Sequence, residues 1–375
     1  YMPARFEDLF WAPVPKDESG WASWFGDLEG LDGIESRRPI ELVPYVASDV
    51  ALTSDELLNP DDPFSDDAEF GARVGADLKM GIGAGLTFDA TFNPDFGQVE
   101  ADPAEVNLSA FPTFFDERRP FFVENADLLE ANDLFFSRRI GERPHGRTPG
   151  DFADVPEATT ILGAAKLTGR TAGGLSIGAL GAVTGEESAE FFDADAGRFD
   201  RARVEPATGW LVLRGLQEFG TANNTAGLAL TGVRRDLSDD DPLAGILNQE
   251  AYAGGADLQL QFDGGLTNLE VVLQGSHISG TPEAIARVQR FSSHYFQRPD
   301  AGHVELDPTR TSLTGYRGGV EFSRRDGNHW LFESYAQATS PEFDINDAGA
   351  LSRADRIEGG VDLSYTENRV GTFRS

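Results

Sequence analysis

The sequence contains no cysteine, no long apolar run and few basic residues, and each absence excludes a class of protein. Without cysteine, the 375-residue chain forms neither disulfides nor thiolate metal sites. No apolar run approaches the roughly 18 residues that indicate a transmembrane helix. Lys and Arg number 31 against 63 Asp and Glu, for a formal net charge of −32, which argues against nucleic-acid binding because that requires clustered cations. The excess of acidic residues is instead compatible with polar loops, with binding of divalent cations or with adaptation to high salt.

The chain does have a repeated alternation of apolar and polar side chains. From Tyr252 to Phe262 every second residue is apolar or Gly, and Asp263-Gly264-Gly265 then supplies a tight turn. Pro44 places the first strand at an edge or a bulge. Because the period is two, the apolar residues of these strands should share one continuous outer face. Strands are expected at residues 40–50, 70–81, 84–92, 158–169, 173–184, 208–218, 223–235, 252–262, 268–276, 312–325, 328–339 and 355–366.

Strand length and loop length distinguish the two architectures that produce many amphipathic hairpins. Membrane-spanning strands need about 9–11 residues, whereas the strands of a soluble β-sandwich commonly have about 5–6, and the strands here are long. Tight turns such as 263–265 and 326–327 should lie at one rim. The long polar connections should leave at the opposite rim, as in outer-membrane barrels. The pattern therefore predicts an all-β, antiparallel transmembrane β-barrel with long connections at 184–207, 236–250 and 278–311.

The N-terminal residues are expected to differ from this repeat. Residues 1–38 contain Trp11, Trp21 and Trp24 among several Pro and Gly residues, which indicates an irregular lead-in or a linker from a missing N-terminal domain. The β-barrel domain is expected over residues 39–375. Because the chain opens on Tyr1 rather than Met, we expect it to be part of a longer precursor.

Residues 93–141 combine charged and aromatic side chains without the period of a helix or a strand. We expect this segment to fold partly into the barrel and to pair its own charges, because a buried lone charge is unfavourable by several kcal/mol. Arg118, Arg119, Arg138 and Arg139 should point at least partly inward and pair with carboxylates among Asp95, Glu100, Asp102, Glu117 and Glu124. The alternative, which the pattern favours, is a structural salt-bridge cluster that closes one end of the barrel. The candidate lumen or plug residues are Asn93, Asp95, Gln98, Glu100, Asp102, Asn107, Glu117, Arg118, Arg119, Glu124, Arg138 and Arg139.

Two patterns invite a catalytic interpretation, and neither yields a catalytic residue. Glu100 and Asp102 are paired carboxylates, but a glycosidase needs its two carboxyl groups about 5–9.5 Å apart across a sugar, which sequence spacing does not establish. The run 174–178 fits the Gly-x-Ser-x-Gly nucleophile elbow, yet it continues a strand and no helix follows. The five His lack metal-ligand spacing. No cofactor or metal site is expected beyond weak Ca²⁺ binding in the acidic loops 59–69, 193–200 and 236–241.

Three motifs resemble those of a known family. The runs 93–103 (Asn-Pro-Asp-Phe-Gly-Gln-Val-Glu-Ala-Asp-Pro), 118–122 (Arg-Arg-Pro-Phe-Phe) and 137–141 (Ser-Arg-Arg-Ile-Gly) are similar to motifs of a family of bacterial outer-membrane β-barrel proteins of unknown function. Residues 44–46 match the family's first strand, and later landmarks match at 295–300 and 340–347. Departures occur at Pro112, where relatives have Glu, and at Asn125 and Glu342, where relatives have Gly.

The resemblance implies a location in the bacterial outer membrane, in contact with its lipid. Members of that family often carry an N-terminal domain similar to family-nine carbohydrate-binding modules, which makes carbohydrate a further expected partner. Their barrel usually continues past residue 375, so this chain would hold an incomplete fragment of a larger barrel. The implied function is binding or passage of carbohydrate or another polar solute. The alternatives are a cell-surface hydrolase acting on a polysaccharide and a structural or assembly barrel.

Overall fold

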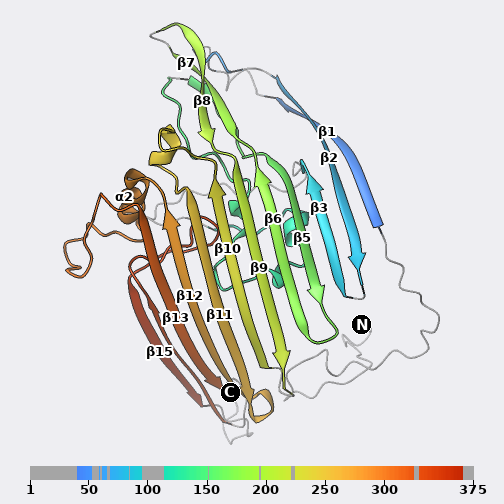
Figure 1. The fold of residues 1–375 in the computed structure, drawn as a ribbon, viewed down its shortest axis with the longest axis vertical. Coiled ribbons are helices and arrows are strands. Elements are labelled where there is room, and N and C mark those ends of the chain that lie inside the picture. The colour runs from blue at the N-terminus through green and yellow to red at the C-terminus, as the bar shows by residue number, and fades with distance from the viewer. Residues whose placement is uncertain are drawn as a thin grey trace, which may run out of the picture. The chain divides into compact units, whose positions relative to one another are not determined.

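The chain folds as a large antiparallel sheet whose strands follow one another in sequence. The computed structural model describes residues 40–52, 59, 61–65, 68–83, 85–94, 114–150, 152–193, 196–220, 224–324 and 329–365. Within them, twelve strands form one sheet in the order β1-β2-β3-β5-β6-β9-β10-β11-β12-β13-β14-β15 (Figure 1). The strands of this sheet are β1 (Ile40–Leu52), β2 (Ala68–Ile82), β3 (Leu86–Phe92), β5 (Ile161–Arg170), β6 (Leu175–Thr184), β9 (Thr208–Phe219), β10 (Asn224–Arg235), β11 (Glu250–Phe262), β12 (Thr267–Ser279), β13 (Ser312–Arg324), β14 (Trp330–Thr339) and β15 (Arg356–Tyr365).

The remaining elements are short. A second sheet has the order β4-β7-β8 and comprises β4 (Phe152–Asp154), β7 (Glu187–Asp193) and β8 (Arg198–Glu205). Among the described residues, no helix is long and apolar enough to cross a membrane. The helices are α1 (Pro120–Val123), α2 (Pro282–Arg290) and the 3₁₀ turns η2 (Ala126–Leu128), η3 (Ser137–Arg139), η4 (Pro242–Gly245) and η5 (Asp263–Gly265).

The predicted strands are confirmed, with bounds that differ by a few residues. Every strand of the large sheet except β3 has ten or more residues. Pro44 lies in β1, which pairs only with β2 among the described residues and is therefore an edge strand, as its missing N–H requires. Local structure in two of the long connections was not predicted: 184–207 contains the strands β7 and β8, and 278–311 contains the helix α2. Polar sequence in both connections thus adopts local structure.

The long connections lie at one end of the sheet. Neighbouring strands are antiparallel throughout, so successive connections alternate between the two ends. The connections 185–207, 236–249 and 280–311 leave at the end near α2, opposite the turn η5 (Figure 1). The predicted asymmetry is confirmed for these loops, whereas the expected turn at 326–327 lies outside the described residues. We call the end with the long connections the loop end.

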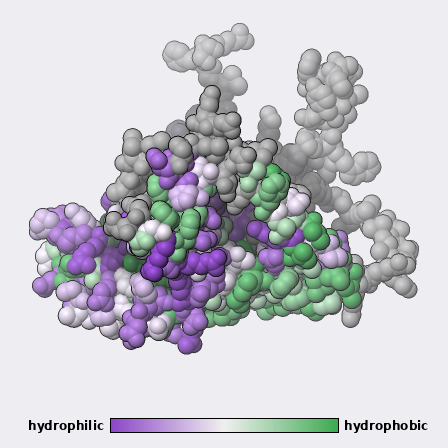
Figure 2. Space-filling model, turned by 90° about the horizontal axis from the view of Figure 1, so that it is seen from above, coloured by the Kyte–Doolittle hydropathy of each residue, from purple (hydrophilic) through white to green (hydrophobic). Residues whose placement is uncertain are grey.

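One face of the large sheet is apolar from edge to edge. In the strand register, Leu42 stands beside Leu78, and the same row continues to Leu211 and then to Tyr252. We call this surface the apolar face. Seen from the loop end, hydrophobic residues gather along one side of the molecule (Figure 2). Exposed apolar residues on it include Ile40, Leu42, Val46, Val50, Phe70, Val74, Phe92, Val183, Leu211, Leu213, Leu228, Leu230, Tyr252, Leu273, Tyr316, Val320, Ile357, Val361 and Leu363.

The opposite face carries both polar and buried apolar side chains and is covered by two segments of the same chain. Residues 114–141 and 340–355 lie against it, and we call it the covered face. Lys166 Nζ donates hydrogen bonds to the carbonyl oxygens of Phe121 (2.5 Å) and Glu124 (2.7 Å), and Gln274 donates one to Asn132 O (2.7 Å). Apolar residues of both segments, such as Leu129 and Phe343, complete buried clusters with the sheet.

Two glycines permit this close covering. A Cβ on Gly178 would lie 2.0 Å from Leu128 O, and a Cβ on Gly315 would lie 2.1 Å from Phe343 N. Any side chain at either position would therefore push a covering segment off the sheet. Gly178 is the last residue of the Gly-x-Ser-x-Gly pattern, so its glycine has a packing role within β6.

Candidate functional site

The charged segment is fastened by a buried pair between Glu117 and Arg119. Arg119 donates to the Glu117 carboxylate from Nε (2.8 Å) and Nη2 (2.7 Å), and Ser137 Oγ donates to it at 2.6 Å. Arg119 also donates to Ile140 O (2.6 Å) and stacks 4.3 Å from the centre of the Phe122 ring. Burial acts to raise the pKa of Glu117, but the hydrogen bonds and charge of Arg119 outweigh it and hold that pKa below its usual value.

The other predicted residues have separate surroundings. Arg138 donates to Asp116 O (2.9 Å), and Glu124 forms its ion pair with Lys79 rather than with an arginine. Arg118 lies on the exposed side of the segment. Asn93 donates from Nδ2 to Val74 O (2.7 Å) and joins β2 to the end of β3. The residues that lie outside the described part of the chain are Asp95, Gln98, Glu100, Asp102 and Asn107.

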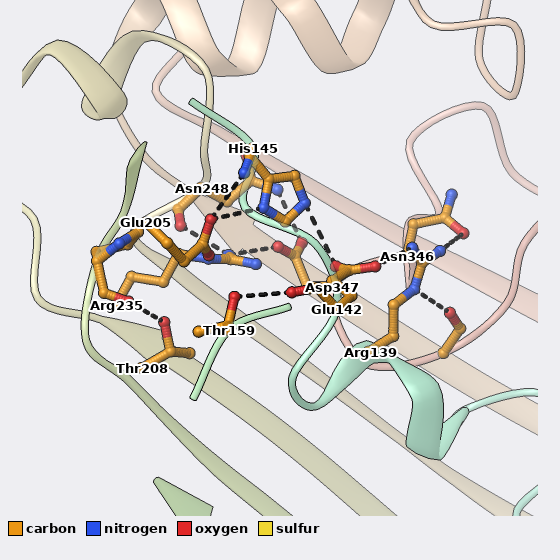
Figure 3. Close-up of polar contacts among 12 residues, drawn as sticks. Arg139, Glu142, His145, Thr159, Glu205, Thr208, Arg235, Asn248, Asn346 and Asp347 are labelled. Atoms are coloured by element: carbon orange, nitrogen blue, oxygen red, sulfur yellow. Dashed lines mark hydrogen bonds and ion pairs between the residues drawn. The ribbon is translucent and has the colours of Figure 1, made fainter. Parts of the chain in front are cut away.

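Arg139 leads into a cavity at the loop end of the covered face, lined by both apolar and charged side chains, which we call the polar cavity after the charged ones. Its guanidinium donates to Gly349 O (3.2 Å) and pairs with Glu142 (3.3 Å), a carboxylate outside the predicted set. The cavity has a volume of about 340 Å³ and lies between the segment after η3, the β10–β11 connection, α2 and residues 344–351. Figure 3 shows the polar side chains of this region and the contacts that join them.

One wall of the cavity is a buried ion pair. Arg235, the last residue of β10, pairs with Asp347 at 2.5 Å, and their side chains are only 3% and 9% exposed. Asn248 donates from Nδ2 to the same carboxylate (2.8 Å), and Arg235 Nη1 donates to Asn248 O (2.9 Å). Within the described residues, Arg235 Nε and Asn248 Oδ1 have no hydrogen-bond partner. A buried donor and a buried acceptor are thus left unsatisfied beside one cavity.

A second wall is a histidine held between two carboxylates. His145 Nδ1 lies 2.9 Å from Glu205 Oε2, and Nε2 lies 3.3 Å from Glu142 Oε1 (Figure 3). Burial acts to lower the pKa of His145, but hydrogen bonds to both glutamates outweigh it and raise the pKa to about 9. The ring is therefore an imidazolium at neutral pH, and it fastens the segment after η3 to the end of β8.

This arrangement predicts a pH-dependent opening. Because the folded pKa of His145 lies above its ordinary value, its stabilising contribution is full below about pH 6.5 and is lost as pH rises through about 9. Protection factors for amide exchange of residues 142–147, corrected for the intrinsic effect of pH, should fall between these limits. In His145→Gln the protection should already be low at pH 6 and change little. Equal pH profiles for the two proteins would contradict the proposed clamp.

A buried histidine lies behind a third wall, which Ser293 and Asp344 line on the α2 side. Ser293 Oγ lies 2.9 Å from His294 Nδ1, and His294 Nε2 lies 3.2 Å from Phe343 O and 3.4 Å from Asp344 Oδ2. Both ring nitrogens are thus occupied, and the ring is fully buried. Burial raises the pKa of Asp344, an effect that the charge of His294 opposes. The contact joins the chain after α2 to residues 340–355.

The cavity residues are not among the sequence candidates, apart from Arg139. Their signals in the sequence are weak. Asp344-Ile345-Asn346-Asp347 is part of the landmark 340–347, and Arg234-Arg235-Asp236 ends a strand with charge. Neither pattern indicates which distant residue its charges will meet. Within the described residues, no group of three or more His, Asp and Glu is arranged to hold a metal ion.

One protein family matches the chain over most of its length. Residues 39–372 match the family described as Domain of unknown function (DUF5916). The chain belongs to that family. The DUF5916 match includes the whole large sheet and every residue of the cavity, so the cavity is part of the family domain. A link to a carbohydrate-binding module is not part of this match. A comparison with curated proteins gives no match.

Solved structures similar to the DUF5916 chain include a porin and an outer-membrane protein. The porin is 14% identical, with 89% of this chain and 91% of that chain covered and a TM-score of 0.32. A loop L8 deletion mutant of OmpT, an outer membrane protein of Vibrio cholerae, is 9% identical, with 88% and 99% covered and a TM-score of 0.31. Both TM-scores are low.

Proposed function

We propose that this chain is an outer-membrane β-barrel domain, or a large part of one, that binds or passes carbohydrate or another polar solute. The observation that supports it most is the apolar face, which continues across twelve strands, all but one of them ten or more residues long. A soluble protein rarely exposes so large an apolar surface, and in water it would drive association. A lipid bilayer satisfies that face, while the polar groups of the covered face stay inside.

The polar cavity supports the solute part of this proposal. Small-molecule sites commonly have volumes of roughly 300–1,000 Å³ with a few convergent polar groups, and this cavity is of that size. The unsatisfied Arg235 Nε and Asn248 Oδ1 beside it suit a hydroxyl-rich ligand or its ordered water, since a hydroxyl both donates and accepts. Phe291 adds an exposed aromatic ring to the lining.

A structural or assembly barrel is the second candidate, and the covering segments favour it. Residues 114–141 contact the sheet through backbone carbonyls, ion pairs and apolar clusters, which would close the interior to solutes. Reconstitution of the full-length protein in planar bilayers separates the two. Solute passage gives single-channel conductance that decreases when the permeant glycan is added. Stable insertion without conductance would support the structural barrel, and failure to insert into any bilayer would contradict both.

Binding in the cavity predicts different effects for two arginines of α2. Both side chains are exposed, but Arg287 lines the cavity and stacks 5.2 Å from the centre of the Phe291 ring, whereas Arg290, about one turn later, does not line it. We expect Arg287→Ala to weaken binding of oligosaccharides about tenfold, the loss of one or two hydrogen bonds from a charged donor. Arg290→Ala should bind like the parent. Titration calorimetry against an oligosaccharide panel measures both, and equal affinities would place binding elsewhere.

A further inference from the structure

The apolar face contains a groove whose floor is made of glycine. Its volume is about 790 Å³, larger than that of the polar cavity. Gly163, Gly181, Gly209 and Gly232 line it on four adjacent strands, β5, β6, β9 and β10. A Cβ on Gly181 or Gly209 would meet no heavy atom closer than 3.8 Å. Backbone packing therefore does not require glycine at these two positions, and what their missing side chains create is an open space on the apolar face.

The walls of the groove are large exposed apolar side chains. Leu162 and Val183 stand on one side, and Leu211, Leu230 and Tyr252 stand on the other. The strand register places Gly181 beside Leu211 and Gly209 beside Val183, so small and large residues alternate across the strands. The lining offers a ligand almost nothing but carbon, which suits a hydrocarbon chain and excludes a sugar.

One charged residue stands at the loop end of the groove. Arg234 lies on the apolar face next to the end of β10, lines the groove and has a side chain that is 76% exposed. Its ion pair with Glu250, at 3.5 Å, engages Nε. Arg carries five N–H donors in a planar fork that suits phosphate oxygens, so donors remain for a second anion. The position fits a phosphate at the depth where the apolar face ends.

We propose that the groove holds one phospholipid, with an acyl chain over the glycines and the phosphate at Arg234. This inference rests on the proposed location in a membrane and adds a specific lipid site to it. The apolar walls recognise the chain, the glycine floor lets it lie below the surrounding surface, and the guanidinium selects a phosphate over an uncharged head. Such a lipid remains bound when the surrounding bilayer lipid is removed.

Two glycine substitutions test the acyl-chain site. The full chain is purified in mild detergent and phosphatidylglycerol is added in mixed micelles, with retained lipid counted by native mass spectrometry. The parent should retain one phosphatidylglycerol per chain. Gly181→Leu and Gly209→Leu, which fill the groove, should reduce retention severalfold. Gly215→Leu is the matched control, because Gly215 lies on the same face of β9, a Cβ there would have no heavy atom within 4 Å, and it does not line the groove. That variant should retain lipid like the parent.

A substitution of Arg234 tests the phosphate contact. The parent should prefer phosphatidylglycerol over diacylglycerol with the same chains, and Arg234→Gln should abolish that preference while still binding the acyl chain. Equal lipid retention in Gly181→Leu and the parent would overturn the inference, and so would equal loss in Gly215→Leu. A change in oligomeric state on filling the groove would assign it to a second copy instead. Because binding is measured in micelles, failure of the parent to insert into bilayers would count against the proposed function alone.

Discussion

Replacing Arg119 by Ala should lower the free energy of unfolding by about 3–5 kcal/mol, because it leaves Glu117 buried without its cation. The Arg119 and Glu117 side chains are only 14% and 13% exposed. The substitution also removes the donors to Ile140 O and Ser137 O, which join the two halves of the segment. Heat-modifiable migration on a gel and equilibrium urea unfolding in detergent micelles would measure the loss.

An exposed pair provides the control for Arg119. Arg198 and Asp200 lie 3.4 Å apart, and their side chains are more than half exposed. Arg198→Ala should change the stability by no more than about 1 kcal/mol, since solvent screens such a pair. If Arg119→Ala proved as mild as Arg198→Ala, the Glu117–Arg119 pair would not be what joins the two halves of residues 114–141.

Leu228→Arg should destabilise the protein in a bilayer by about 2–4 kcal/mol, the effect of a charge on the lipid face near the membrane midplane. Leu228 is 69% exposed and lies within β10, between residues that carry the apolar face. In a soluble sheet the same substitution at an exposed site would change stability by no more than about 0.5 kcal/mol. The stability measured in lipid vesicles therefore tests the orientation of the whole face.

A residue expected to lie near the membrane interface provides the control for Leu228. Phe262 is also exposed and apolar, but it is the last residue of β11, next to the turn η5. Phe262→Arg should cost only about 0–1 kcal/mol, because a charge near the interface reaches water. Equal and small effects at both positions would mean that the apolar face contacts something other than the interior of a bilayer.

The sheet could be predicted because each strand and turn is specified by residues that are neighbours in the sequence. Alternation with a period of two sets both the strand and the face, and turns such as Asp263-Gly264-Gly265 fix the register of neighbouring strands. The helix α2 also has a local signal inside its polar connection: Thr281 caps it through Ala284 N, and Pro282 and Glu283 follow in its first turn. The local sequence signal for the strands β7 and β8 is weaker, because most of their residues are polar.

The cavity was not predictable, because its contacts join residues far apart in the sequence. Arg235 and Asp347 are 112 positions apart, and Arg139 donates to a carbonyl 210 positions away. Each partner is an ordinary charged or polar residue at the end of a strand or in a loop. Arg119 does pair with a carboxylate of the same segment, Glu117, as expected. Arg139 instead pairs with Glu142, and Glu124 pairs with Lys79, and neither partner lies within residues 93–141.

The contact between the two covering segments determines the order in which the molecule is completed. Phe136 N–H donates to Ala348 O (2.8 Å), and Ala350 N–H donates to Asp133 O (3.0 Å), so these neighbours in space are far apart in the order of synthesis. Closing so long a loop is entropically unfavourable and slows folding. The contact between the two covering segments therefore forms only after residue 350 has been added. Until then, we expect the nascent chain to depend on chaperones that prevent aggregation of its apolar strands.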